Sequence, residues 1–230
     1  TNGILVNNYI EELKYYLLDN TISLVISLDS LRPDVHNSIR SYSLAWQKTT
    51  EALNNLSLLK KEYPNIKLGV ITIILNQNLE ELVDLADFVK NKDVNFIQFQ
   101  PLLSNNLKMW EREKSPFWVS DDRLSLLDNV IDDLVEFKKR NSEFVRNSVK
   151  NLLLIKKYYR GTISYKDVEC KSAYDTVLMS NEGKFTTCFS CYGNIKSQSL
   201  LEILRSKQRI KAQERVKKCS WPCLLPCFCD

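Results

Sequence analysis

Three apolar segments rich in β-branched and aromatic residues constrain the fold of this chain most strongly. They occupy residues 21–28, 67–75 and 95–99 and read as buried strands. Helical patterns at residues 9–18, 45–61 and 79–90 alternate with them, and Asn78 is expected to cap the last of these, with Glu81 completing a capping box. Strands that alternate with helices at this spacing predict βαβ units and a parallel α/β sheet.

A different pattern follows Pro101. Residues 102–120 carry Trp110 and Trp118 without a clear period and are expected to form a long irregular connection. Helices are predicted over residues 121–140 and 149–160, the second ending before Gly161. Beyond it we expect a hairpin over residues 175–189, turning near Gly183, and one helix of roughly 18 residues that begins at Leu200. The shift in composition near residue 161 predicts two domains, residues 1–160 and 161–230.

The chain's seven cysteines all follow residue 169. Seven is an odd number, and the protein is neither small nor loop-rich, so a disulfide framework is disfavoured. Clustered thiols in a lysine-rich chain are typical of metal ligands in a reducing compartment, and we therefore expect a cytoplasmic protein. The cysteines are Cys170, Cys188, Cys191, Cys219, Cys223, Cys227 and Cys229.

The charge of the chain is unevenly distributed. Residues 1–145 contain 16 Lys and Arg against 21 Asp and Glu, whereas residues 146–230 contain 16 against 7. A basic C-terminal part can attract an acidic partner or offset the charge of metal-bound thiolates. Its lysines are not interleaved with aromatic residues, which disfavours nucleic acid. No apolar run reaches the roughly 18 residues of a membrane helix, so no membrane is expected.

The strand ends carry a recurrent set of polar residues. The chain opens with Thr1-Asn2-Gly3, the first strand ends in Ser27-Leu28-Asp29-Ser30, and the second ends at Asn76. In this order they resemble the second half of a radical S-adenosylmethionine (SAM, also AdoMet) enzyme. The resemblance covers essentially the whole chain and implies the second half of a partial (β/α)6 TIM-like barrel, with its ligand sites at the carboxyl ends of the strands.

The C-terminal segment also resembles this family. Cys170, twelve residues, Gly183, four residues and Cys188 are similar to the hairpin of its SPASM/twitch extension, a small cysteine-rich hairpin-helix module. Such modules bind auxiliary 4Fe–4S clusters, and four thiolates are the usual ligands of such a cluster. The terminal spacing, Cys219-x3-Cys223-x3-Cys227, differs from that of two-cluster members and favours one auxiliary cluster.

The family's CxxxCxxC loop, which holds the cluster that cleaves SAM, does not occur in these residues. Because Thr1-Asn2-Gly3 is similar to the end of the family's third barrel strand, both this loop and the glycine-rich segment after it would precede Thr1. We therefore expect an N-terminally truncated piece that is inactive alone.

The resemblance implies a role for each polar residue at the strand ends. Ser27 and Asp29 share one face of a strand and would bind the ribose hydroxyls, although a plain polar cap of the strand would use the same residues. Arg40 would pair with the carboxylate of the methionine half, or it is a surface arginine. The predicted SAM-binding residues are Asn2, Ser27, Asp29, Arg40 and Asn76. His36, the only histidine, is expected to support a loop rather than catalysis.

For the cysteines, two metal sites remain open, an auxiliary iron–sulfur cluster and a structural zinc, since four thiolates suit both. The candidate ligands are Cys170, Cys188, Cys219, Cys223 and Cys227.

The resemblance implies an oxidoreductase or maturase. The intact enzyme would cleave SAM reductively to a 5′-deoxyadenosyl radical that abstracts hydrogen from a substrate, a peptide or protein being one candidate. It would take its electron from an external donor. The alternative is a zinc-stabilised, non-catalytic domain that binds an acidic or nucleic-acid partner.

Overall fold

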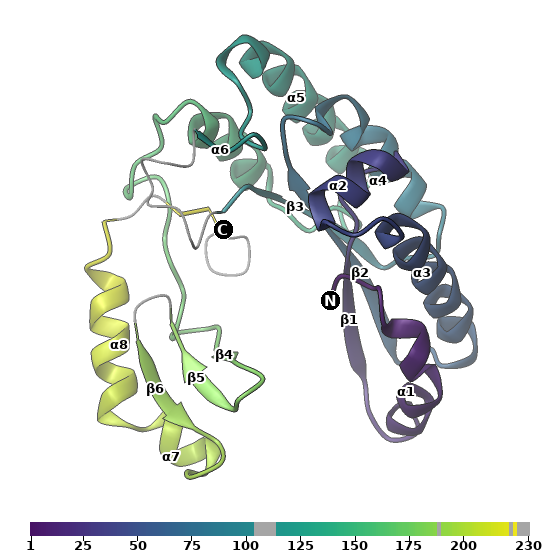
Figure 1. Ribbon diagram of the computed structural model, residues 1–230. Coiled ribbons are helices and arrows are strands. Elements are labelled where there is room, and N and C mark those ends of the chain that lie inside the picture. Colours follow the sequence, from purple (N-terminus) through teal and green to yellow (C-terminus); the bar gives the residue numbers. More distant parts are fainter. Residues whose placement is uncertain (104–113, 188–189, 221–222, 225–230) are drawn as a thin grey trace. The chain divides into compact units, whose positions relative to one another are not determined.

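The computed structural model describes residues 1–103, 114–187, 190–220 and 223–224. The chain divides into two compact units, Thr1–Gly161 and Thr162–Asp230 (Figure 1). This division lies one residue from the boundary predicted by the shift in composition. Among the helices that the structure describes, none combines the length and apolar character that crossing a membrane requires.

The first unit is built on a parallel three-stranded sheet. Its strands are β1 (Ile22–Ser27), β2 (Ile66–Ile74) and β3 (Phe96–Pro101), in the order β1-β2-β3. The register aligns Ser27 with Ile71 and Ile73 with Gln100. The predicted parallel strands are therefore confirmed.

Helices join and cover these strands. Figure 1 shows α3 (Ala45–Glu62) and α4 (Leu82–Lys90) along one side of the sheet. The remaining helical elements of this unit are η1 (Val6–Tyr9), α1 (Ile10–Leu17), α2 (Pro33–Arg40), η2 (Leu79–Glu81), η4 (Asp121–Arg123), α5 (Leu124–Arg140) and α6 (Val149–Tyr159). The loop expected around His36 is wrong, because Pro33 and Asp34 begin a helix there. Proline at the first helical position and an acid in the first turn both favour a helix start.

The two faces of the sheet differ in burial. Ile26, Val70 and Ile97 are aligned across the three strands and are fully buried. On the opposite face Ser27 and Ile71 are only half-buried, whereas Gln98, aligned with them on β3, is buried. Side chains alternate along a strand, so the face that carries Ser27 is the one the helices leave partly open.

Backbone hydrogen bonds extend the sheet at both edges. At the β1 edge, the N-terminal ammonium of Thr1 donates to the Val25 carbonyl at 2.9 Å, and the Ser27 amide donates to the Thr1 carbonyl at 2.9 Å. At the β3 edge, the Ile97 amide donates to the Phe144 carbonyl at 2.8 Å, and Val145 forms an isolated parallel bridge with Ile97. Both patterns are those of a parallel ladder.

The second unit contains a small antiparallel sheet with strands β4 (Leu178–Met179), β5 (Lys184–Thr186) and β6 (Cys191–Asn194). The predicted hairpin is confirmed, and Gly183 occupies its turn with a φ of 81°, which favours glycine. A buried apolar cluster lies beneath the strands and consists of Ala173, Phe185, Tyr192, Ile203 and Ala212.

The single long helix predicted from Leu200 is wrong. Two helices, α7 (Leu200–Leu204) and α8 (Lys207–Lys217), replace it. Ser206 begins the second helix, and its side chain accepts a hydrogen bond from the Arg209 amide. A serine in this capping position favours a new helix start over continuation. Ser199 and Glu202 form a capping box at the start of α7.

Candidate functional site

Polar residues lie at or just after the carboxyl ends of all three strands of the first unit's sheet. Ser27 is the last residue of β1, and Asp29 lies two positions after it. Asn76 lies two positions after the end of β2, and Gln100 is the penultimate residue of β3. Because the strands are parallel, these ends lie along the same edge. The parallel order that places these strand ends together is confirmed, whereas SAM binding by Ser27, Asp29 and Asn76 stays a prediction.

Asp29 is fully buried and bound on both carboxylate oxygens. Its Oδ1 accepts a hydrogen bond from the Ile73 amide at 3.1 Å, and its Oδ2 lies 2.5 Å from a guanidinium nitrogen of Arg40. Burial raises the pKa of the Asp29 carboxyl, and the Arg40 cation acts in the opposite direction. The carboxylate thus joins β2 to α2.

Arg40 occupies the last turn of α2, and its side chain is partly exposed. The sequence placed it opposite a ligand carboxylate, but the partner that the structure shows is Asp29. A guanidinium has five N–H donors, so an ion pair with Asp29 leaves capacity for a second anion. The predicted role in SAM binding therefore remains a prediction, with Asp29 as the group that orients Arg40.

His36 is fully buried on α2, and its Nδ1 accepts a hydrogen bond from the Asp29 amide at 3.2 Å. Burial, with a smaller contribution from Arg40, lowers the pKa of His36 to about 4. The imidazole is consequently neutral near pH 7, with its proton on Nε2. This geometry assigns His36 to the support of Asp29.

Asn78 occupies the predicted N-cap position, directly before η2, but its side chain makes no cap hydrogen bond there. Its Nδ2 donates to the Asp29 carbonyl at 2.6 Å and to the Ile73 carbonyl at 2.8 Å, while its Oδ1 accepts from the Leu75 amide at 2.8 Å. The Asn78 carboxamide therefore forms its hydrogen bonds with backbone groups at the ends of β1 and β2, and not with the amides of the following helix.

Asn76 binds the segment that precedes α5, through Phe117, Ser120 and Arg123. The Asn76 amide donates to the Phe117 carbonyl at 3.0 Å, and its Oδ1 accepts from the Ser120 amide at 3.3 Å. Arg123 donates to the Asn76 carbonyl. Asn76 therefore has a structural role beside its predicted ligand role.

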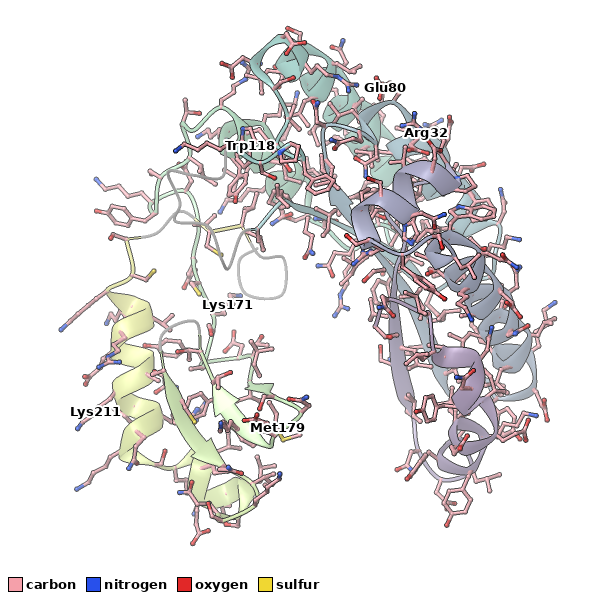
Figure 2. All side chains as sticks on the ribbon, in the orientation of Figure 1. Arg32, Glu80, Trp118, Lys171, Met179 and Lys211 are labelled. Atoms are coloured by element: carbon pink, nitrogen blue, oxygen red, sulfur yellow. The ribbon has the colours of Figure 1, made fainter. Side chains whose placement is uncertain are left out.

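Glu81 was expected in a capping box but binds the loop after β1 instead. Its carboxylate accepts from the Ser30 hydroxyl at 2.6 Å, the Leu31 amide at 2.8 Å and Nε of Arg32 at 3.3 Å. Figure 2 labels Arg32 together with Glu80, and both lie at this end of the unit. The sequence offered no signal for this contact, which joins residues about fifty positions apart.

Aromatic side chains pack beside the ends of β2 and β3. The Trp118 ring lies 4.6 Å from the Tyr159 ring and 5.6 Å from the Tyr158 ring, centroid to centroid. The Tyr159 hydroxyl donates to the Ile74 carbonyl and accepts from the Leu102 amide at 2.8 Å. Trp118, labelled in Figure 2, is buried, which agrees with the packing role that aromatics most often have. Trp110 lies outside the described residues.

Two further predicted site residues lie at this unit's β1 edge. Asn2 is exposed, and its Oδ1 accepts from the Ile4 amide at 3.1 Å. Ser27 is half-buried on the partly open face of the sheet.

The cysteines belong to the second unit. Cys170, Cys219 and Cys223 are partly buried, and Cys191 is exposed. Cys188 and Cys227 lie outside the described residues. Among the residues that the structure describes, no three His, Cys, Asp or Glu side chains form a group able to hold a metal ion. As a donor set, thiols in one compact unit have the chemistry that an iron–sulfur cluster or a zinc ion requires.

The fold defines an α/β protein with polar residues at the carboxyl ends of parallel strands. No family model matches the chain. Two curated relatives are the GTP 3′,8-cyclases of Limosilactobacillus fermentum and Lactiplantibacillus plantarum, 34% and 32% identical over 116 residues. The match covers 49% of this chain, and the chain spans about a third (32%) of the length of each relative.

Solved structures share the fold of the whole chain. Native anSMEcpe with bound AdoMet and Kp18Cys peptide has a TM-score of 0.60 and 18% identity, covering 100% of this chain and 64% of that one. Native anSMEcpe with bound AdoMet gives the same TM-score and identity over 63% of its length. These relatives are radical SAM enzymes, and the chain is accordingly a relative of the radical SAM class of enzymes.

Proposed function

We propose that the intact protein cleaves SAM reductively and uses the resulting 5′-deoxyadenosyl radical to abstract hydrogen from a substrate. The carrying observation is the set of polar side chains at the strand ends of a fold shared with an AdoMet-bound structure. Residues 1–160 would form the second half of the partial barrel. A 4Fe–4S cluster held by a CxxxCxxC loop outside these residues would supply the electron, received from an external donor.

In this function the described residues bind and orient SAM. Arg40 would pair with the carboxylate of the methionine half, while Asp29 fixes the guanidinium from behind. Ser27 would donate to a ribose hydroxyl, and Asn2 and Asn76 would complete the polar contacts. His36 holds the Asp29 amide. The partly open face beside Ser27 would admit the substrate.

Ser27 provides a direct test. In the intact, reconstituted protein, Ser27→Ala should raise the KM for SAM about tenfold, because one hydrogen bond to the ligand is lost. Ser23→Ala is the matched control, since Ser23 is an exposed residue four positions earlier on the same face of β1. The measurement is 5′-deoxyadenosine formation under reducing, anaerobic conditions. Absence of this product with the unmodified protein would reject the proposed function.

For residues 161–230 we propose a SPASM/twitch-like domain with one auxiliary 4Fe–4S cluster. Cys170 and Cys188 would supply two thiolates, and two of Cys219, Cys223 and Cys227 would supply the others. The chemistry of this donor set supports the proposal. The cluster would accept an electron from the substrate radical or help to anchor the substrate.

Metal analysis tests this proposal. Anaerobic reconstitution of residues 1–230 should load about four irons per chain. Cys170→Ala or Cys188→Ala should abolish loading, whereas Cys191→Ala, an exposed cysteine of the same unit, should leave it unchanged. Stoichiometric zinc without iron in anaerobically purified protein would contradict the cluster and favour the alternative, a zinc-stabilised binding domain.

The substrate that we propose is a peptide or protein. The solved structures that cover the whole chain include complexes with the Kp18Cys and Cp18Cys peptides, whereas the match to the GTP 3′,8-cyclases covers about half of it. Incubation with peptide libraries and with GTP would separate the two. Hydrogen transfer from GTP alone would contradict a peptide substrate. We expect this chemistry in the cytoplasm, where thiols and clusters stay reduced.

The alternative of an acidic partner is supported by one feature of α8. Lys207 and Lys211 lie one turn apart on α8 and Lys218 directly follows the helix; all three are exposed, with one exposed acid, Glu214, between them, and Figure 2 labels Lys211. A basic helix face of this kind suits an acidic protein better than nucleic acid, since no aromatic residues alternate with the lysines.

A further inference from the structure

Side chains, rather than backbone groups, join the last residues of β1 to β2. The final backbone hydrogen bond of the ladder runs from the Leu28 amide to the Ile71 carbonyl at 3.1 Å. Beyond it, the Thr72 hydroxyl donates to the Leu28 carbonyl at 2.7 Å, and the Asp29 carboxylate accepts from the Ile73 amide. The geometry of the strand ends therefore depends on side chains, at the point where the predicted SAM residues lie.

Asn78 completes this arrangement. It is fully buried, and both its carboxamide donor hydrogens and its carbonyl oxygen are used. The nitrogen bridges the Asp29 and Ile73 carbonyls, one on each strand end, and the oxygen receives the Leu75 amide. Only a carboxamide offers two donors and an acceptor in this geometry; a carboxylate would face two carbonyl oxygens without a hydrogen to share.

Asp29 transmits the position of Asn78 to Arg40. Asn78 holds the Asp29 carbonyl, and the Asp29 carboxylate holds the Arg40 guanidinium. Displacing the Asp29 backbone therefore moves the cation that the proposed function places against the SAM carboxylate.

We propose that Asn78 is a positioning residue for the SAM site, acting through Asp29 and Arg40. This role rests on the proposed function. It does not require Asn78 to touch SAM. It accounts for a buried asparagine whose side chain makes no cap hydrogen bond.

Asn147 offers a closely matched control. It is 2% exposed, its Oδ1 accepts from the Phe99 amide at 2.8 Å, and its Nδ2 donates to the Phe99 carbonyl and to Asn151 at 2.7 Å. It thus makes the same types of hydrogen bond with similar burial. Its partners are Phe99 of β3 and Asn151 of α6, which differ from the groups that bind Asp29 and Arg40.

The experiment compares Asn78→Asp with Asn147→Asp in the intact, reconstituted protein. Urea denaturation should show stability losses of similar size, because each change removes two buried donations. The dissociation constant for SAM should rise about tenfold in Asn78→Asp and stay within about twofold in Asn147→Asp. Should either aspartate variant fail to fold, Asn78→Ser and Asn147→Ser, which keep one donor, should give the same order.

Two negative results have different meanings. If the unmodified protein binds SAM and the dissociation constants of the two variants are equal, whether unchanged or raised, the role of Asn78 is rejected and the proposed function is not affected. If the unmodified protein does not bind SAM, the proposed function is rejected, and this role for Asn78 with it.

Discussion

Burial determines the properties of the individual polar residues at the end of the sheet. Asp29, His36 and Asn78 have no exposed surface, so each must find its hydrogen-bond partners within the protein. They do so mainly through one another and through the ends of β1 and β2, except for Nε2 of His36, which has no hydrogen-bond partner among the described residues. A change to any one of them is therefore expected to affect the others.

His36 makes stability depend on pH. Its folded pKa of about 4 lies below the unfolded value of 6.5, so the unfolded state binds more protons between these values. Stability from this group is present above pH 6.5 and is lost as the pH falls toward 4. Between pH 7 and pH 5 we expect a loss of about 2 kcal/mol.

The measurement is urea denaturation across this range for wild type and His36→Asn. Asparagine keeps an acceptor near the Nδ1 position but does not titrate. Burial raises the pKa of Asp29, so this group changes stability with pH in the opposite direction. Because both proteins contain Asp29, the difference between their stability profiles isolates the contribution of His36. Identical pH profiles would show that His36 does not titrate on unfolding as described.

Gly69 is required by the Phe96 side chain. A Cβ at position 69 would lie 2.2 Å from the Phe96 ring, which crosses the neighbouring strand at this register position. Gly69→Ala should therefore destabilise the protein by about 1–3 kcal/mol. In a Phe96→Ala background the same change should cost much less, measured as a double-mutant cycle. Equal costs in both backgrounds would contradict the clash.

At the scale of elements, the short helices of the second unit depend on their first residues. Ser199 and Ser206 each accept a hydrogen bond from an amide in the first turn, and Glu202 completes the capping box. Helices of this length are marginal without tertiary contacts or caps. Because Ser206 caps the start of α8, the single helix predicted from Leu200 is divided into α7 and α8.

Ser199→Ala should lower the stability of this unit by about 1 kcal/mol, because both hydrogen bonds of the Ser199 hydroxyl, with the Glu202 amide and carboxylate, are lost. Thermal denaturation with far-UV detection measures the effect. Ser197→Ala is the control, since Ser197 is exposed and lies outside the helix. A comparable loss from Ser197→Ala would mean that the cap itself contributes little.

At the scale of the whole molecule, the two units bury different kinds of core. The first has aligned aliphatic residues between a sheet and its helices, whereas the described residues of the second contain a cluster of five buried apolar residues and a few others, such as Val216. A core of that size supplies little stability, so the second unit is the one expected to depend on metal.

Chelation under reducing conditions should therefore reduce hydrogen-exchange protection in residues 178–217 and leave residues 22–101 unchanged. Mass spectrometry of exchanged peptides reports both regions in one experiment. Equal protection with and without metal throughout the second unit would contradict metal-dependent folding.

The sequence determined the three parallel strands, the hairpin, the helix boundaries outside residues 33–40 and 200–217, and the resemblance to radical SAM enzymes. Periodicity, turn glycines and capping residues act over a few positions, and for that reason a linear pattern reveals them. The sequence also indicated which polar residues lie at the strand ends, because parallel strands bring their carboxyl ends to one edge of the sheet.

Only the tertiary structure decided what those residues bind. The bonds of Asp29 to Ile73, of Asn78 to Asp29 and of Ser30 to Glu81 span 44, 49 and 51 positions. Asn78 and Glu81 have the spacing of a capping box, and locally that was the favoured use. Once packing buried them beside the end of β1, carbonyl and hydroxyl groups cut off from water competed for the same side chains, and those groups won because an unpaired buried polar atom is costly.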